Sequence, residues 1–256
     1  MFHAPRRAAI AVAMVAALGI SAPAPAVAAR PAALPKATTF TSLTGLPLDS
    51  DKFGKLSGLV VHPKRAVGVY PAPGGKAVAV LPATQLGGPT WVPVVESRSG
   101  WVRVLLPSKP NYATGWIRSK GLQRASSHFR VVVDLSDKKL AVVSYTKKGK
   151  KVRAKKVGTW TVAVGSPESP TPVGRTFLLA LMAPKEKKYS PFILPLGTHS
   201  QTLDSFGGGP GTVAFHGWPD PKVFGKAVTH GCVRVPPSAL KVLVKLPLGT
   251  PVLIAD

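Results

Sequence analysis

Short β-type runs, separated by proline and glycine, constrain the fold of this 256-residue chain more than any other feature. Between residues 64 and 124, five such runs follow one another at close spacing, and Gly or Pro stands between them. This rhythm predicts a small β-barrel, in which alternating aromatic side chains pack inward. The runs cover residues 66–70, 77–81, 90–95, 101–105 and 115–118.

The second half of the chain continues this pattern. Residues 129–135 and 140–145 predict a hairpin, and residues 237–246 predict the one clear helix, with Pro237 at its start and apolar residues at helical spacing. We therefore expect a mainly β protein with one or two short helices. Further strands are expected at residues 156–164, 176–182, 213–215 and 252–254.

The N-terminus has the pattern of an export signal. Arg6 and Arg7 precede an apolar run at residues 8–20, and small residues follow up to Ala28, so residues 1–28 predict a signal peptide. The run is shorter than the roughly 20 residues that span a membrane. We therefore expect cleavage, with uncleaved anchoring as the alternative, and a secreted, cell-wall-associated protein without a stable membrane span.

The composition of the residues that follow the expected signal peptide indicates a connecting segment rather than a folded domain. Residues 29–63 begin with a stretch rich in Ala, Pro, Thr and Ser that lacks strong periodicity, which predicts a flexible linker. We expect a barrel domain at residues 64–125 and a catalytic domain at residues 126–256.

The net charge of +24 favours polyanionic surroundings. An exported chain meets cell-wall polymers and anionic lipid headgroups first, so we expect anionic wall polymers and no nucleic acid as partners. The densest cationic cluster covers residues 147–156 and predicts a solvated hairpin that turns at Lys148-Gly149. Electrostatic retention at the wall is a secondary interpretation of this cluster.

Cys232 is the only cysteine, so a disulfide within the chain is excluded. A lone cysteine with His216 and His230 nearby in the sequence is a candidate nucleophile, and export makes an unpaired thiol more informative. One alternative is an inert buried side chain. Another is a zinc site that includes His199, but the paired ligand spacings of such sites are missing. We expect no metal and no cofactor.

The motifs around this cysteine resemble the L,D-transpeptidase (YkuD) catalytic domain over roughly residues 129–256. The resemblance rests on five motifs in the order of that family, and the preceding residues 100–117 resemble bacterial SH3-like domains. It implies a small SH3-like β-barrel followed by an L,D-transpeptidase-type β-sandwich. The motifs are Thr171–Phe177, His216-Gly217, Phe224-Gly225, Thr229–Arg234 and Pro247–Val252.

The resemblance also implies roles for individual residues. Cys232 would be the nucleophile, His216 the general base, and the backbone carbonyl of Gly217 the group that orients the base. The backbone amides of His230, Gly231 and Cys232 would form the oxyanion hole.

Substrate contacts are expected from Arg234, Thr229, Trp218 and His230. Arg234 could bind a substrate carboxylate or an internal acidic residue. Thr229 stands where Ser is commonest in the family, and Trp218 stands where a small residue is usual. His199 is expected at the surface.

The implied function is an exported cysteine-dependent L,D-transpeptidase. It would cleave the terminal D-Ala from a tetrapeptide stem of peptidoglycan and transfer the acyl group to the side-chain amine of another stem. Carbapenem β-lactams would be covalent inhibitors. Two alternatives stay open, an L,D-carboxypeptidase with water as acceptor and a non-catalytic wall-binding protein.

Overall fold

The computed structural model describes Met1 and residues 33–148, 151–186, 188–206 and 209–256. The expected signal peptide beyond Met1 and the expected turn at Gly149 lie outside the described residues. Within the described part, no helix has both the length and the apolar character that a membrane crossing requires.

An antiparallel five-stranded sheet in the order β8-β7-β6-β1-β9 dominates the first half. All five runs that the sequence singled out contain strands, whereas β1 and β9 were not predicted. No comparison assigns this half to the SH3-like domains, so that resemblance stays a prediction. The elements are β1 (Leu59–Pro63), β2 (Val67–Val69), β3 (Ala79–Leu81), β4 (Thr84–Gln85), β5 (Gly88–Pro89), β6 (Val92–Arg98), β7 (Trp101–Leu105), β8 (Thr114–Arg118) and β9 (Leu122–Ser126).

The flexible linker expected at residues 29–63 does not hold for its described part. Residues 59–63 form β1, which lies between β6 and β9 in the sheet. Upstream of β1, the Ala37 N–H donates to Val80 O at 2.7 Å and the Leu43 N–H donates to Lys109 O at 2.8 Å. Ala37 and Leu43 are also buried. The described part of this segment therefore packs onto the first half and does not act as a flexible connection to the expected signal peptide.

The second half contains two mixed sheets that enclose a core with one helix. Buried residues of both sheets and of α1 form one hydrophobic cluster, and the helix ends at Leu243 rather than at residue 246. The mainly β architecture is confirmed. One sheet has the order β12-β11-β10-β21-β14 and the other β15-β18-β20. The elements are β10 (Phe129–Asp134), β11 (Lys139–Lys148), β12 (Lys151–Thr161), β13 (Val164–Gly165), β14 (Gly174–Phe177), β15 (Ile193–His199), β16 (Ser205–Phe206), β17 (Gly209–Pro210), β18 (Thr212–His216), η1 (Pro221–Val223), β19 (Ala227–Thr229), β20 (Val233–Arg234), α1 (Pro237–Leu243) and β21 (Pro251–Ala255).

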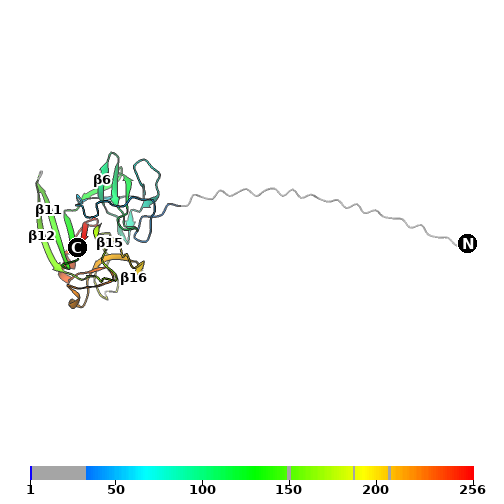
Figure 1. The fold of residues 1–256 in the computed structure, drawn as a ribbon. Helices are drawn as coiled ribbons and strands as arrows, with labels where there is room; N and C mark the ends of the chain where they lie inside the picture. The colour runs from blue at the N-terminus through cyan, green and yellow to red at the C-terminus, as the bar shows by residue number, and fades with distance from the viewer. Residues whose placement is uncertain (2–32, 149–150, 187, 207–208) are drawn as a thin grey trace. The chain divides into compact units, whose positions relative to one another are not determined.

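The cationic cluster belongs to the hairpin of β11 and β12, labelled in Figure 1. Its register pairs Lys148 with Lys151, so the cluster expected as a solvated hairpin consists of paired strands. The neighbouring strand β10 pairs with β11 only up to Ser144. The distal part of the hairpin therefore extends beyond the sheet as a two-stranded ribbon.

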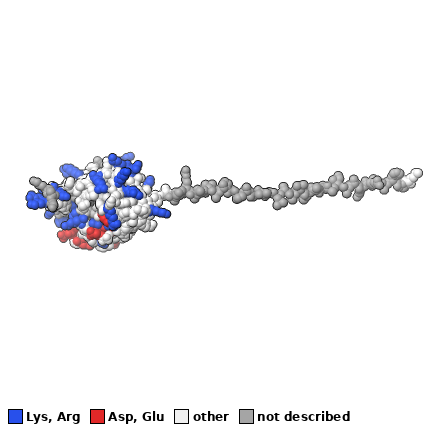
Figure 2. All heavy atoms as spheres, turned by 90° about the horizontal axis from the view of Figure 1, so that it is seen from above, with Lys and Arg blue, Asp and Glu red and all other residues white. Residues whose placement is uncertain are grey.

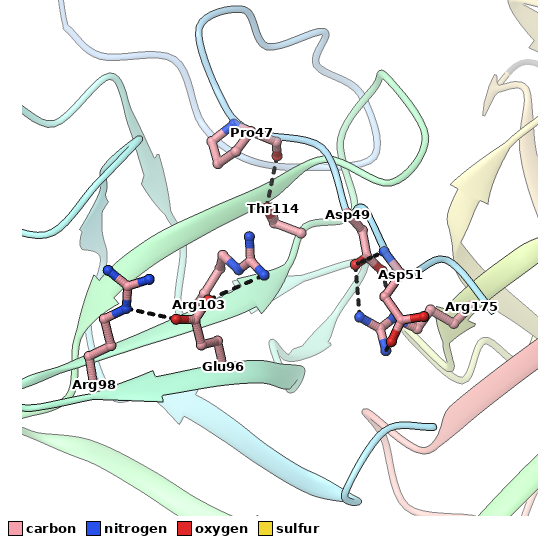
Figure 3. A network of polar contacts seen from close by, with 8 residues as sticks. All are labelled: Pro47, Asp49, Asp51, Glu96, Arg98, Arg103, Thr114 and Arg175. Atoms are coloured by element: carbon pink, nitrogen blue, oxygen red, sulfur yellow. Dashed lines mark hydrogen bonds and ion pairs between the residues drawn. The ribbon is translucent and has the colours of Figure 1, made fainter. Parts of the chain in front are cut away.

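The two halves share a core and a buried ion pair. Phe177 and Leu179, from the second half, are fully buried in the hydrophobic cluster of the first half. Beside them, the Arg175 guanidinium donates to both carboxylate oxygens of Asp49, from Nε at 2.5 Å and from Nη2 at 2.7 Å, as Figure 3 shows. Residues 34–256 form one compact unit that contains two hydrophobic clusters, one mainly in each half.

Candidate active site

Parallel pairing of β18 with β20 brings the candidate base and nucleophile to one face of a sheet. His216 is the register partner of Arg234, and Phe215 is the partner of Val233. Side chains alternate between the two faces of a strand. Phe215 and Val233 point into the core, where both are fully buried. His216 and Cys232, which precedes Arg234 by two residues, therefore share the opposite face.

The imidazole of His216 is held in one tautomer by its own chain. Its Nδ1 atom lies 2.8 Å from the carbonyl oxygen of Gly217. A carbonyl can only accept, so Nδ1 carries the hydrogen and Nε2 keeps a free lone pair. Gly217 is held in place in turn. Its N–H donates to Ser190 Oγ at 2.7 Å, and the Ser190 hydroxyl donates to Phe192 O at 2.6 Å.

A glycine turn and two threonines fix the backbone before Cys232. Gly231 has φ +107°, a conformation that other residues rarely adopt. Thr229 Oγ1 accepts from the Gly231 N–H at 3.1 Å and donates to Cys232 O at 2.5 Å. Thr171 Oγ1 donates to Gly231 O at 2.9 Å. Because Thr229 and Thr171 are both buried, this turn is held from two sides.

The pKa shifts of this pair favour its neutral forms. Burial lowers the pKa of His216, the Gly217 carbonyl opposes this, and the positive charge of Arg234 lowers it further. Burial raises the pKa of Cys232, against the Ala214 N–H and the charge of Arg234, which lower it. At neutral pH the site thus holds a thiol beside a neutral imidazole. Such a pair can transfer a proton during an attack by sulfur.

Aromatic and cationic side chains surround His216. The Tyr189 ring meets the imidazole edge-on, with centroids 5.1 Å apart, and lies 5.9 Å from the Trp218 ring. The Arg234 guanidinium lies 3.6 Å from the Trp218 ring centroid. Arg234 forms no ion pair with any described carboxylate, and its buried Nε has no hydrogen-bond partner. The internal acidic partner considered for Arg234 is therefore absent from the described residues.

Two cavities flank this pair. The larger, of about 620 Å³, lies on the side of Gly217 and Trp218, and its walls are mostly apolar, including Tyr189, Phe192 and Leu240. A much smaller one reaches Cys232 itself, between Ser200, Phe206, Val213 and His230. The thiol can therefore be approached from a narrow opening, while the residues that follow the base, Gly217 and Trp218, border a wide apolar one.

The other two histidines near the motifs differ from one another. His230 is exposed and its ring lies 5.3 Å from that of Phe206. His199 is not at the surface as expected, because only 1% of it is exposed and its Nε2 lies 2.8 Å from Thr39 O. Segment 34–58, which covers it, was expected to be a linker. Among the described residues, no group of three potential metal ligands lies together.

Ser190, Tyr189 and Thr171 contact the site, although sequence reasoning assigned them no role there. Ser190 and Tyr189 precede the strand that pairs with β18, and no motif contains them. Thr171 opens the matched segment Thr171–Phe177, and that position was the one available indication. Their contacts depend on how β15 and the turn at Gly231 pack.

The comparisons with known proteins concern the second half of the chain. Residues 128–254 match the model of the L,D-transpeptidase catalytic domain, YkuD. The chain therefore carries a catalytic domain of the L,D-transpeptidase family. A comparison with curated proteins gave no match.

Solved structures with a similar fold include Bd1075 from Bdellovibrio bacteriovorus, at 24% identity over 51% of this chain and 48% of that one, with TM-score 0.39. This chain thus spans about half of that protein. An L,D-transpeptidase from Mycobacterium smegmatis matches at 15% identity over 63% and 80%, with TM-score 0.40. L,D-transpeptidase 3 from Mycobacterium tuberculosis, solved with a faropenem-derived adduct, matches at 15% over 58% and 75%, with TM-score 0.37.

Proposed function

We propose that this chain is an exported peptidoglycan L,D-transpeptidase with Cys232 as nucleophile and His216 as general base. One observation carries the proposal. The Nδ1 of His216 donates to Gly217 O, which leaves the Nε2 lone pair on the sheet face that His216 shares with Cys232. The family match of residues 128–254 supports the reaction class.

In the first half-reaction, the Cys232 sulfur attacks the carbonyl between the third residue of a tetrapeptide stem and its terminal D-Ala. His216 Nε2 takes the thiol proton as the carbon–sulfur bond forms. The imidazolium then gives this proton to the leaving amine, the peptide carbon–nitrogen bond breaks, and D-Ala departs. A thioester on Cys232 remains.

In the second half-reaction, the side-chain amine of another stem attacks the thioester carbonyl. His216 removes the amine proton and returns it to the departing sulfur, which restores the thiol. In this proposal the acceptor stem enters the mostly apolar cavity beside Gly217 and Trp218.

Backbone amides stabilise the oxyanion in this proposal. The amides of His230, Gly231 and Cys232 lie in the turn that Gly231 permits. In the free protein the Gly231 N–H already donates to Thr229 Oγ1, so this amide must exchange the hydroxyl for the substrate oxygen. Arg234, Trp218 and His230 are the proposed substrate contacts, whereas Thr229, which was expected among them, is buried and holds the turn before Cys232.

The deciding experiment incubates the purified protein with a tetrapeptide stem and identifies products by mass spectrometry. A cross-linked dimer with loss of D-Ala supports transfer, and a tripeptide alone supports the L,D-carboxypeptidase. Cys232→Ala is the control and should yield neither. Unchanged protein and substrate, in a sample that retains its fold by circular dichroism, would support the non-catalytic wall-binding alternative.

A further inference from the structure

A groove of about 600 Å³ lies at the base of the β11–β12 hairpin, remote in sequence from Cys232. Its floor and walls come from segment 55–58, from segment 126–130 and from the distal hairpin. This groove exists because the hairpin extends beyond β10 and leaves one of its faces opposite segment 55–58.

Positive charge lines this groove. Lys55, Arg130 and Lys147 border it together with His128, and no described lining residue carries a carboxylate. None of the three cations forms an ion pair with a described carboxylate. The cationic charge of the groove is therefore not neutralised from within the described part of the protein.

The guanidinium of Arg130 is fixed in place inside the groove. It lies 5.3 Å from the ring centroid of Tyr145, and its Nη2 donates to Leu56 O at 3.2 Å. A guanidinium has five N–H donors, so this bond leaves donors for an anion. Ordered donors lose less entropy on binding than free ones, which suits Arg130 for phosphate oxygens.

The register of the hairpin continues this charge along one face. Val143 is the partner of Lys156, and Arg130 is the partner of Val143, so these three residues share a face of the sheet. Lys147, paired with Val152, lies further along the same face. Figure 2 shows Lys and Arg gathered at the hairpin end of the described part. The cations that line the groove, Lys55, Arg130 and Lys147, thus come from three separate segments, and Lys156 lies outside the lining on the same face of the sheet.

We propose that this groove binds a linear polymer with repeated phosphodiester groups. The inference does not depend on the transpeptidase activity. Lys55, Arg130 and Lys147 form no ion pair with a described carboxylate, so their charges are available to anionic groups that repeat along a polymer chain. Concavity favours a single polymer chain over a bilayer, since a flat membrane surface cannot reach Arg130 at the base of a groove.

The test measures binding of linear polyphosphate to the full chain by fluorescence anisotropy at low and at raised salt. Lys55→Gln combined with Lys147→Gln should weaken binding at low salt by about tenfold or more, because each removes one phosphate contact. The slope of log affinity against log salt should also fall, by about one for each lysine. Arg130→Lys keeps the positive charge but loses the planar set of guanidinium N–H donors, so it should weaken binding at every salt concentration.

A second cationic surface supplies the matched control. Lys64 and Lys120 are both exposed and border another groove, of about 480 Å³, so their double change to Gln removes the same charge elsewhere. The proposal predicts a loss under about threefold for this control, since only long-range charge is removed. Equal losses in both doubles, or no loss in either, would overturn the proposal.

Two further measurements distinguish the other outcomes. Binding to vesicles of phosphatidylglycerol without binding to polyphosphate would make this surface a membrane contact and would also overturn the proposal. Carbapenem acylation of the Lys55/Lys147 double variant should equal that of the unmodified protein. A protein that binds polyphosphate at the groove but is never acylated would refute the transpeptidase proposal alone.

Discussion

Ser190 Oγ accepts the N–H of Gly217 at 2.7 Å, and through this bond it holds the residue whose carbonyl orients the imidazole of His216. The serine itself is buried and donates to Phe192 O at 2.6 Å. A hydroxyl from the segment before β15 thus sets the orientation of a base on β18. The substrate need not touch Ser190 for this residue to affect the reaction.

Ser190→Ala should slow carbapenem acylation by about tenfold, because a peptide that is free to move holds the base in its productive orientation for less of the time. It should also lower the free energy of unfolding by about 1–3 kcal/mol, since a buried N–H and a buried carbonyl lose their partner. Stopped-flow acylation and urea unfolding measure the two effects. An unchanged acylation rate would contradict this positioning role.

The two histidines near Cys232 should differ in their effect on rate. His216→Ala should slow acylation by about 10²–10⁴, the usual effect of removing a general base. His230→Ala should have a smaller effect, because this side chain is exposed and contacts Phe206 rather than the base. Rates measured on both variants, each checked by circular dichroism, decide the assignment. A larger loss for His230→Ala would reverse the two roles.

Acylation should depend on pH through His216. Burial lowers the pKa of His216, so the imidazole stays neutral to below its ordinary pKa of about 6.5. The rate should therefore be level through neutral pH and fall in acid with a midpoint under 6.5. Burial also raises the pKa of Cys232, so alkylation by iodoacetamide should keep rising at alkaline pH. A midpoint above 6.5 for acylation would contradict this electrostatic description.

Stability should also fall in acid, through His199. Burial lowers the pKa of His199 in the folded protein, so below about pH 6.5 the unfolded chain binds more protons and unfolding becomes easier. Stability should therefore be level above this pH and decrease as pH falls toward the folded pKa. His199→Gln should flatten this slope in urea unfolding between pH 7 and 5. Because His216 has the same direction of shift, some slope should remain.

The buried ion pair between Asp49 and Arg175 joins the two halves, so its removal should lower the stability of the protein. Asp49→Ala should lower the free energy of unfolding by about 3 kcal/mol, because it leaves the buried guanidinium of Arg175 with only the exposed carboxylate of Asp51, at 3.5 Å. Asp49→Ala combined with Arg175→Met should recover much of this loss. Chemical unfolding of the three proteins checks the prediction, and equal stability of the single and double variants would contradict it.

Sequence reasoning could predict the strands with clear alternation and the motifs around Cys232. Val131 and Val133 alternate with half-buried residues, and Gly231 adopts the positive φ that its place before Cys232 suggested. The fold of segment 34–58 could not be predicted in this way. Its order depends on backbone hydrogen bonds to residues far along the chain, such as Val80 and Lys109, and composition carries no information on these partners.

The same limit explains the errors at the site. His199 was expected at the surface, yet Thr39, 160 residues away, covers it. The sequence around Ser190 did not indicate a role at the site, because this role arises from a contact with Gly217, 27 residues further on. Contacts between segments far apart in the sequence determine both the burial of His199 and the role of Ser190, and short motifs carry no information on such contacts.

The stacking of Arg234 on Trp218 gives this site an optical property. Trp218 is one of five tryptophans, and its indole stacks against the guanidinium of Arg234 and lines the cavity beside Gly217. Indole emission shifts with the polarity of its surroundings, so a ligand that displaces the guanidinium or fills that cavity changes the emission of Trp218. The occupancy of the proposed acceptor side can therefore be followed by intrinsic fluorescence, without a chemical label.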